Sequence, residues 1–502
     1  MFLLVLLGQV TLCRYGVHIG FAAANAWVDL SVSEARDMID SDIALTILDV
    51  RNQSEYDRGH IGHSKLIPLW QFESRIDELD KHAKTLVYCS SGYRSPLACE
   101  MLENHSFSKV YNIVGGIEDW SIAGYPVYVH YSSLQEAVNT AAESSLLYVG
   151  SGTYHEYVAV NKTISLIGED AQTTVIDGSG IPFIVEITAP NVTVSGFTLM
   201  NSLEGVYLRG LANSCSIKDC KMVNNRVGVL VETEYNLIAG NVFANNNDSG
   251  IKIFPLCPGC YLLKKNIIKQ NEFLNNSYGL WLDYSLNTTV FHNNFIDNTY
   301  QVHTLGSTTT WDDGYPSGGN YWNGNHADLF RGSSQNLSGS DGIDDIAYMI
   351  DTNNIDKYPL AGPSTDFEAG TWNNVSFRVE FVSNFSVSDF QFDPSEGPCL
   401  SFSLTGPNET SGFCRTAIPK DLLWAEDGWT IHLGGQLADS AIFSDDNKTY
   451  LYISSPYSMT TAQILGTHVI PEFRFSVPLL ILMAFVSVSV VMKKASKPRF
   501  LP

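Results

Sequence analysis

The sequence predicts a multidomain chain in which a parallel α/β domain, a right-handed parallel β-helix, a small β-sandwich and one transmembrane helix follow one another. Three observations support this prediction. Short apolar strands alternate with helical patterns before residue 130, a glycine-marked motif recurs between residues 205 and 282, and an uncharged run precedes a basic C-terminus. The predicted boundaries are 27–130 for the α/β domain, 131–365 for the β-helix and 366–468 for the β-sandwich.

Length and charge limit the class of function. The 502 residues exceed one compact domain of roughly 150 residues, so about three folded units are expected. The 53 acidic and 30 basic residues give a net charge of −23, which argues against nucleic acid as a partner. Only 17% of the residues are charged, and Asn, Ser, Thr and Gly fill the deficit, as suits turn-rich β-structure.

Both ends of the chain predict export. The uncharged residues 475–492 are just long enough to cross a bilayer, and the basic tail 493–502 is expected in the cytoplasm. A buried core helix is the alternative reading of this run. The apolar start and the small residues up to Ala26 predict a signal peptide over 1–26, although a basic n-region is missing. We therefore expect a single-pass protein of the cell membrane with most of the chain extracellular.

Nine cysteines in an exported chain raise the question of disulfides. Three pairs are close in the sequence: Cys215 with Cys220, Cys257 with Cys260, and Cys399 with Cys414. Their spacing does not determine their connectivity. The second pair could instead bind a metal, but no further Cys/His pair stands at zinc-finger spacing, which favours a disulfide or a loop staple.

The α/β domain should carry its chemistry where its strands end. Residues 44–50 and 85–88 are short apolar runs typical of buried parallel strands, and Cys89 follows the second. The next residues form a small-residue loop before a helix predicted over 95–103, so backbone N–H groups and the helix N-terminus make a cradle for an anion. Beside Arg94, Cys89 is predicted to ionise to a nucleophilic thiolate. The alternative is a buried strand-end cysteine without a role.

Residues 30–127 resemble a single-domain rhodanese, a sulfurtransferase module. The resemblance rests on four segments: Asp49-Val50-Arg51, Glu55-Tyr56 with Gly59-His60-Ile61-Gly62, the loop Cys89-Ser90-Ser91-Gly92-Tyr93-Arg94-Ser95, and Gly115-Gly116-Ile117-Glu118-Asp119-Trp120. The interval between Cys89 and Arg94 is the loop length of sulfurtransferases rather than of related phosphatases. His63 and Ser90 depart from the family pattern. Ser90 stands where the family often has Arg, which points to an altered substrate preference.

The resemblance implies a mechanism. Cys89 attacks the sulfane sulfur of a donor such as thiosulfate, sulfite leaves, and the persulfide passes to a thiol or other acceptor. The loop and Arg94 stabilise the persulfide, the substrate-binding positions being Ser90, Ser91, Gly92, Tyr93 and Ser95. The remaining matches are given structural roles, because such residues at strand and turn ends more often tie down backbone than catalyse: Asp49, Arg51, His60 and Trp120.

A repeat marks the β-helix. Segments beginning at Gly205, Gly228, Gly250 and Gly279 recur at intervals of 23, 22 and 29 residues. Asn pairs before the last three glycines are expected to stack along the axis, and the longest interval, which contains Cys257 and Cys260, is expected to loop out. The region resembles NosD-type and carbohydrate-associated β-helix proteins, which implies copper or polysaccharide as ligand. Copper is disfavoured because His, Met and Cys do not cluster in sequence.

Two further segments complete the prediction. Asp341, Asp344 and Asp345 are weak calcium candidates, and a solvated acidic turn is favoured because the EF-hand spacing is missing. No other cofactor is expected. Residues 370–466 alternate strands with turns, which predicts a β-sandwich without catalytic residues. Pro471-Glu472-Phe473 before the predicted span resembles the PEF-type sorting signals of archaeal surface proteins.

Together these patterns predict a membrane-anchored, extracytoplasmic sulfurtransferase of rhodanese type. Its expected partners are a small sulfur donor, a thiol acceptor, the membrane and a polysaccharide bound by the β-helix. The alternative is a non-catalytic surface protein whose rhodanese fold is idle and whose β-helix binds glycan or metal. The nucleophile and cation, Cys89 and Arg94, favour the enzyme.

Overall fold

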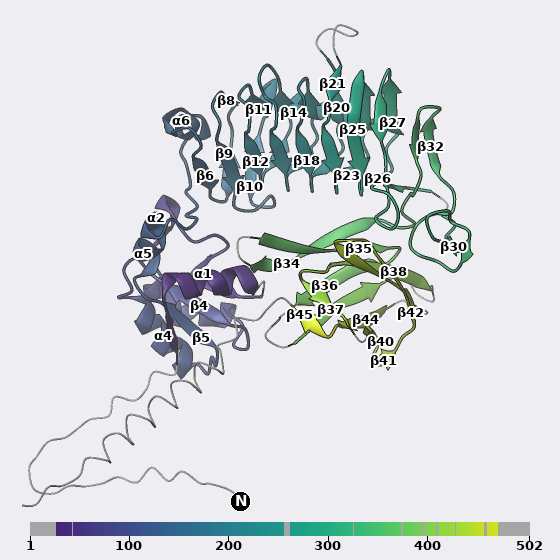
Figure 1. Ribbon diagram of the computed structural model, residues 1–502. Coiled ribbons are helices and arrows are strands. Elements are labelled where there is room, and N and C mark those ends of the chain that lie inside the picture. Colours follow the sequence, from purple (N-terminus) through teal and green to yellow (C-terminus); the bar gives the residue numbers. More distant parts are fainter. Residues whose placement is uncertain are drawn as a thin grey trace, which may run out of the picture.

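The computed structural model describes residues 27–469 except 43, 256–261, 325, 373–374, 393, 395–396, 408–409, 427 and 456–458. It contains an α/β domain, a stack of β-coils and a two-sheet β-domain (Figure 1). The predicted signal peptide, membrane span, basic tail and PEF-type motif lie outside the described residues, as do Cys257 and Cys260. Within the described ranges, no helix is both long and apolar enough to cross a membrane.

The α/β domain is built on a parallel five-stranded sheet of order β1-β5-β4-β2-β3. The strands are β1 (Val28–Leu30), β2 (Thr46–Asp49), β3 (Lys65–Leu66), β4 (Thr85–Tyr88) and β5 (Val110–Ile113). The helices are α1 (Val32–Ser41), α2 (Gln53–Arg58), η1 (Leu69–Gln71), α3 (Phe72–Arg75), η2 (Ile76–Glu78), α4 (Ser95–Asn104) and α5 (Gly116–Ile122). Ile47 and Leu86 pack on one face and Leu48 and Val87 on the other. Burial of both faces explains the continuous apolar runs of these strands.

The coil stack is a parallel β-helix with three sheets, preceded by α6 (Leu134–Thr140). One sheet contains β6 (Leu146–Val149), β9 (Ser165–Gly168), β12 (Thr193–Ser195), β15 (Ser216–Lys218), β18 (Leu237–Ala239), β21 (Leu263–Lys264), β22 (Ile267–Lys269), β25 (Ser285–Phe291) and β28 (Thr308–Thr310). A second contains β7 (Gly152–Tyr154), β10 (Thr174–Asp177), β13 (Thr198–Met200), β16 (Lys221–Val223), β19 (Val242–Ala244), β23 (Glu272–Leu274), β26 (Asn294–Ile296) and β29 (Tyr321–Trp322). The third contains β8 (Val158–Val160), β11 (Phe183–Ile187), β14 (Glu204–Leu208), β17 (Val227–Val231), β20 (Ser249–Ile253), β24 (Tyr278–Asp283) and β27 (Tyr300–Leu305).

Buried asparagines bond along the coil axis. The backbone N–H of Asn225 donates to Oδ1 of Asn246 at 3.1 Å, and the N–H of Asn246 donates to Asn276 at 3.0 Å. A second ladder runs through Asn241, Asn271, Asn293 and Asn320. The ladders satisfy polar backbone groups at the coil corners, which would be costly to bury unpaired.

The six described cysteines are all free thiols. The candidate pairs Cys215 with Cys220 and Cys399 with Cys414 therefore form no disulfide. The first two stand at successive coil corners on either side of β15, where their N–H groups donate to asparagines of the next coil. The last two lie in different sheets of the β-sandwich. Proximity in the sequence does not bring either pair together, because strand β15 separates Cys215 from Cys220 and Cys399 and Cys414 belong to different sheets.

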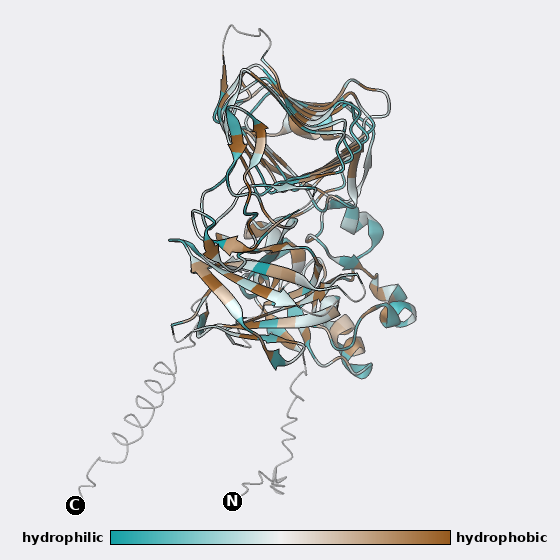
Figure 2. Ribbon diagram, turned by 90° about the vertical axis from the view of Figure 1, so that its right-hand side faces the viewer, coloured by the Kyte–Doolittle hydropathy of each residue, from teal (hydrophilic) through white to brown (hydrophobic). Residues whose placement is uncertain are grey.

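The third unit is a β-sandwich of two antiparallel five-stranded sheets over a common core that includes Phe381 and Phe402. One sheet contains β34 (Ser364–Trp372), β35 (Val375–Ser383), β38 (Gly412–Pro419), β42 (Ser440–Ser444) and β43 (Lys448–Ser455). The other contains β36 (Ser386–Phe392), β37 (Cys399–Thr405), β40 (Thr430–Leu433), β41 (Gln436–Leu437) and β44 (Met459–Leu465). Short pairs remain: β30 (Phe330–Arg331) with β31 (Leu337–Ser338), β32 (Tyr348–Asp351) with β33 (Asn354–Asp356), and β39 (Leu423–Trp424) with β45 (His468–Val469). Figure 2 looks along the coil stack and shows hydrophobic and hydrophilic residues alternating along many strands.

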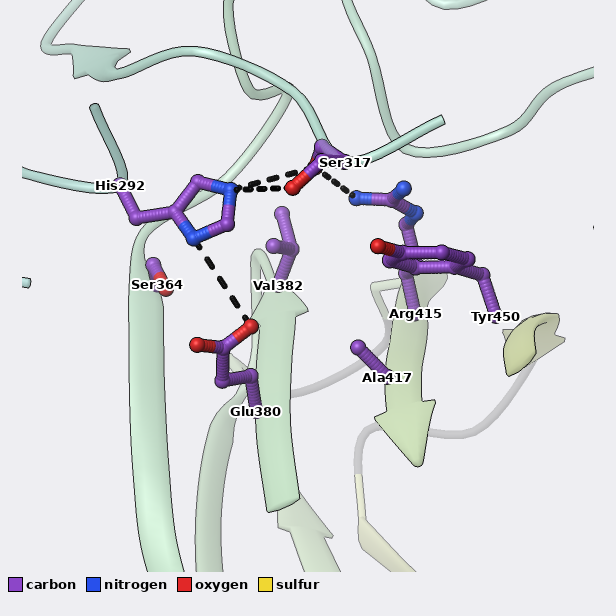
Figure 3. Close-up of a pocket in the computed structure, with 8 residues that line it drawn as sticks. All are labelled: His292, Ser317, Ser364, Glu380, Val382, Arg415, Ala417 and Tyr450. Carbon is purple, nitrogen blue, oxygen red and sulfur yellow. Dashed lines mark hydrogen bonds and ion pairs between the residues drawn. The ribbon is translucent and has the colours of Figure 1, made fainter. Parts of the chain in front are cut away.

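The β-helix and the β-sandwich meet through buried polar groups (Figure 3). Nε2 of His292 lies 3.2 Å from Oγ of Ser317, and its Nδ1 lies 3.8 Å from Oε2 of Glu380. This order resembles a hydrolytic triad, but the Ser317 hydroxyl donates to Asp313 at 2.8 Å. The cavity among these residues measures about 10 Å³, too little for more than about one water molecule. The cluster is therefore a polar contact between domains.

Candidate active site

Cys89 lies at the strand-to-helix junction between β4 and α4. Its Sγ accepts a hydrogen bond from the backbone N–H of Arg94 at 3.3 Å and from the Ser95 hydroxyl at 3.6 Å. Burial raises the pKa of the Cys89 thiol, but the hydrogen bonds from the Ser95 hydroxyl and from loop N–H groups outweigh it, so the net shift is downward. Arg94 and Ser95 thus stabilise the thiolate, the form that attacks sulfur.

The first turn of α5 binds the backbone carbonyl groups of the active loop. The N–H of Ile117 donates to the carbonyl of Cys89 at 2.9 Å, and the N–H of Glu118 donates to the carbonyl of Ser90 at 3.0 Å. A side chain at Gly116, where φ is +59°, would place its Cβ 2.3 Å from the Cys89 carbonyl oxygen. Only glycine permits this close approach, which explains the glycine pair before the helix.

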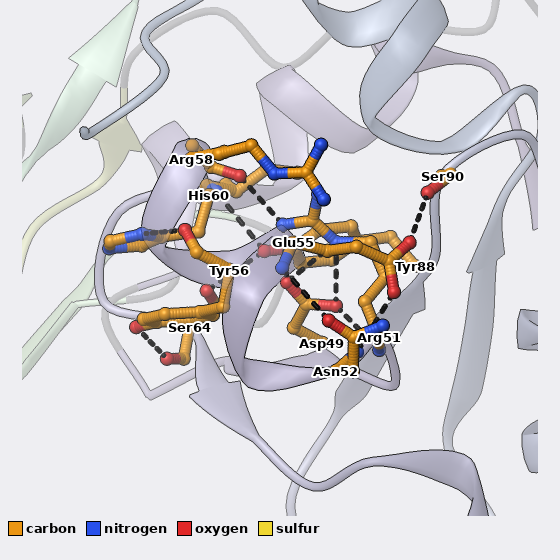
Figure 4. Close-up of polar contacts among 12 residues, drawn as sticks. Asp49, Arg51, Asn52, Glu55, Tyr56, Arg58, His60, Ser64, Tyr88 and Ser90 are labelled. Carbon is orange, nitrogen blue, oxygen red and sulfur yellow. Dashed lines mark hydrogen bonds and ion pairs between the residues drawn. The ribbon is translucent and has the colours of Figure 1, made fainter. Parts of the chain in front are cut away.

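The side chain of Arg94 is bound to Glu55. Nη1 donates to Oε2 at 2.9 Å and Nη2 to Oε1 at 2.5 Å, while Nη2 also donates to Oγ of Ser90 at 3.0 Å. The Ser90 hydroxyl donates to Glu55 at 2.9 Å (Figure 4). Glu55 is held by a capping box with Asn52 at the start of α2, and its hydrogen bonds, chiefly with Arg94, lower its pKa to about 2. Arg94 therefore contributes its N–H to the sulfur and its guanidinium to a salt bridge.

Asp49 and Arg51 form a buried ion pair below the loop (Figure 4). Arg51 donates to both carboxylate oxygens of Asp49, at 3.0 Å and 2.7 Å, and to the carbonyl of Gly59 at 2.7 Å. The pair links the end of β2 to the end of α2. Trp120 is 1% exposed and donates from Nε1 to the Pro126 carbonyl at 2.8 Å, which closes the chain after α5.

His60 joins the α/β domain to the β-helix. Its ring stacks on Tyr56 at 3.8 Å, and Nε2 lies 3.0 Å from Oε2 of Glu169, just beyond β9. Glu169 also accepts hydrogen bonds from the N–H groups of His63 and Ser151, at 2.8 Å and 3.0 Å. Burial raises the pKa of Glu169, but His60 and these N–H groups lower it to about 2. The role of Glu169 shows no signal in the sequence, because His60 and His63 belong to another domain.

An open hollow of about 590 Å³ adjoins the loop at Ser90. Its lining includes Arg58, Glu118 and the apolar side chains of Ile117 and Ile122. Tyr93, in the loop itself, is 82% exposed. Cys89 itself is 1% exposed, so the end of β4 holds a buried nucleophile beside an accessible surface.

The predicted calcium ligands serve as loop caps. Asp341 accepts from the N–H of Ile343, Asp344 from that of Ala327, and Asp345 from those of two residues, Leu329 and Phe330. Among the residues with described positions, no group of three or more His, Cys, Asp or Glu side chains is arranged to hold a metal ion. These carboxylates accept hydrogen bonds from backbone N–H groups, and calcium binding by them stays a prediction.

Aromatic side chains gather on the outer face of β24 and β27. Tyr278 stacks on Tyr300 at a centroid distance of 4.9 Å, and Trp281 lies 3.9 Å from His303. The ammonium group of Lys252 on β20 lies 4.3 Å from the Trp281 ring centroid. These five side chains, called here the aromatic face, lie in rows because neighbouring coils are in register.

Comparison with known proteins identifies two regions. The rhodanese-like domain family matches residues 31–123, and the family of the periplasmic copper-binding protein NosD matches residues 138–327. The protein YrkF of Bacillus subtilis is 37% identical over 98 residues, covering 20% of this chain and 53% of YrkF. The tRNA uridine(34) hydroxylase of Salmonella arizonae is 33% identical over 107 residues, 20% of this chain and 30% of that protein. The chain thus spans about half the length of the first relative and less of the second.

Another relative is matched over most of its length. The thiosulfate sulfurtransferase GlpE of Coxiella burnetii is 32% identical over 76 residues, which cover 15% of this chain and 71% of GlpE. A rhodanese-related protein of Thermoplasma volcanium, 30% identical, is covered completely by 21% of this chain, with a TM-score of 0.20. The likeness to this sulfurtransferase covers most of its length, and the matching domain of this chain holds a hydrogen-bonded cysteine sulfur in its loop. Through residues 31–123, the chain therefore belongs to the family of rhodanese-like proteins.

Proposed function

We propose that the rhodanese-like domain transfers sulfane sulfur through a persulfide on Cys89. The hydrogen-bonded sulfur carries this proposal, since Sγ accepts from the Arg94 N–H and the Ser95 hydroxyl at the start of α4. The thiolate attacks the outer sulfur of the donor, the donor S–S bond breaks, and its electron pair leaves with the remainder, which is sulfite for thiosulfate. An acceptor thiolate then attacks the outer persulfide sulfur, and the Cys89 thiolate leaves.

A thiosulfate-like donor is supported by the likeness to GlpE, whose name states that activity. Treating the full chain with thiosulfate and, separately, with an organic persulfide tests the step by mass spectrometry. One added sulfur on the Cys89 peptide is expected, and none in Cys89→Ser. Sulfur on another cysteine, or no sulfur from either donor, would reject transfer through Cys89. It would favour the alternative in which the rhodanese-like domain is not catalytic.

We further propose that the β-helix binds polysaccharide on the aromatic face. Flat rings next to a cation suit the apolar face and the hydroxyls of a sugar, and Tyr300 is 57% exposed. Affinity electrophoresis of the full chain in gels containing polysaccharide tests this proposal. Tyr300→Ala should abolish a retardation that the matched surface variant Tyr235→Ala keeps, since Tyr235 is 50% exposed outside this face. Equal retardation of both variants would reject the aromatic face as the binding site.

The location proposed for this activity is the outer surface of the cell membrane. Support comes from the sequence of both chain ends, with a signal-like start and an uncharged run over 475–492 before basic residues. The sulfur donor and acceptor would then be met outside the cytoplasm.

A further inference from the structure

The active loop carries a single charged side chain, and that charge is neutralised. Between Cys89 and Ser95 only Arg94 is ionic. Its guanidinium donates two hydrogen bonds to the carboxylate of Glu55, at 2.9 Å and 2.5 Å, and one to Oγ of Ser90 at 3.0 Å. The carboxylate of Glu55 is fixed in place by the α2 capping box, so it accompanies the loop as a permanent counter-charge.

The surroundings of the loop add no net positive charge. Arg51 is paired with Asp49, and the hollow beside Ser90 holds one further cation, Arg58, and one further anion, Glu118. The whole chain has a net charge of −23. A dianion such as thiosulfate therefore approaches a site of balanced charge on a strongly acidic protein, which disfavours its binding and its rate of encounter.

The rim of the loop is apolar. Trp70, Tyr93 and Val114 are 78%, 82% and 51% exposed, and they lie in the segments that follow the parallel strands β3, β4 and β5. Ile122 on α5, which lines the hollow, is 84% exposed. Single exposed apolar residues are ordinary, but Trp70, Tyr93 and Val114 follow strands that end at the same edge of the parallel sheet, and Ile122 lines the hollow beside Ser90.

We infer that the preferred sulfur donor is an organic persulfide whose carrier group is apolar and uncharged, and that Glu55 determines this preference by neutralising Arg94. The inference rests on the proposed function and specifies the class of its sulfur donor as organic persulfides rather than thiosulfate. The Cys89 thiolate attacks the terminal sulfur of R–S–SH, the S–S bond breaks, and the electron pair leaves with R–S⁻. Cys89 is left as a persulfide, and the thiolate released takes up a proton from solvent at neutral pH, so the step needs no oxidant.

The test compares donors across variants of the full chain. The rate of sulfur addition to Cys89 is followed by mass spectrometry with benzyl persulfide and with thiosulfate, at one pH and ionic strength, and expressed as a ratio. Glu55→Gln frees the Arg94 charge and should raise the thiosulfate rate about tenfold relative to benzyl persulfide. Glu100→Gln, the same charge change at an exposed position of α4, should leave the ratio unchanged.

Two further variants keep the test decisive if Glu55→Gln fails to fold. Ser90→Arg adds a cation with Glu55 intact and should move the ratio toward thiosulfate. Tyr93→Ser removes exposed apolar surface beside the loop and should lower the ratio of the benzyl persulfide rate to the thiosulfate rate several-fold. A ratio that stays within twofold in both variants, or a wild-type chain that reacts with thiosulfate alone, would overturn the inference while keeping sulfur transfer. No sulfur on Cys89 from any donor would remove the proposed function itself.

Discussion

Ser95→Ala tests whether side-chain hydrogen bonding activates the nucleophile. The substitution removes the hydroxyl that donates to Sγ of Cys89 at 3.6 Å and leaves the Arg94 N–H in place at 3.3 Å. A hydrogen bond to a charged group contributes about 1.5 kcal/mol, which is slightly more than a factor of ten in the thiolate population. Losing a contact that favours the thiolate raises the thiol pKa. The alkylation rate should thus fall about tenfold below the wild-type pKa and converge with wild type at high pH.

The assay is iodoacetamide alkylation across pH, read on the Cys89 peptide by mass spectrometry. Cys99 does not interfere, because burial raises the pKa of its thiol whereas the pKa of the Cys89 thiol is lowered. Ser91→Ala is the control, since Ser91 is exposed in the same loop and is not among the hydrogen-bond donors to the sulfur. Superimposable rate profiles for Ser95→Ala and wild type would refute the activating role, as would an equal shift in Ser91→Ala.

Three further predictions concern the junction, the coil ladder and the topology. Glu169→Gln should weaken the contact between the α/β domain and the β-helix and so accelerate limited proteolysis near residues 124–133. In the wild type, the pKa of Glu169 is about 2 in the folded junction and 4.5 when the contact is broken. The junction should therefore be intact above pH 4.5 and weaken as the pH falls toward 2. Asn271→Ala orphans the Asn241 N–H and should lower the free energy of unfolding by about 3 kcal/mol in urea titration, whereas exposed Asn247→Ala should stay within about 0.5 kcal/mol. Protease added to intact cells should remove the Cys89 domain if residues 475–492 span the membrane outward; protection that lysis reverses would contradict this topology.

The strand ends and the coil period could be predicted because they are local patterns. An apolar run ending at Cys89, followed by small residues, specifies a strand-to-helix loop without any knowledge of the rest of the chain. The recurrence of glycine at intervals of 23, 22 and 29 residues, with asparagine pairs before the last three glycines, likewise reflects contacts between equivalent positions of adjacent coils. Equivalent positions of adjacent coils have the same backbone conformation and the same neighbours, so the same residue types recur in the sequence.

The pairings that modify the site could not be predicted, because their partners are distant in sequence. Arg94 and Glu55 are 39 residues apart, and the sequence alone suggested that Arg94 would face the sulfur. His60 and Glu169 are 109 residues apart and belong to separate domains. The sequence alone does not separate the two roles of Asp341, Asp344 and Asp345, because capping a backbone N–H group and binding a metal use the same side chain.

The domain arrangement separates the sulfur site from the aromatic face. The α/β domain is fixed to the early coils by Glu169 and to the β-sandwich where α1 meets β34, with Gly370 against the Asp40 carbonyl. The aromatic face lies at the other end of the sheet that runs from β8 to β27, a distance of about 29 Å at ~4.8 Å per strand. A polysaccharide bound there would hold the enzyme at a surface without entering its chemistry. Saturating polysaccharide should therefore leave the rate of Cys89 persulfide formation from a small donor unchanged, and a clear change in that rate would contradict the separation of the two sites.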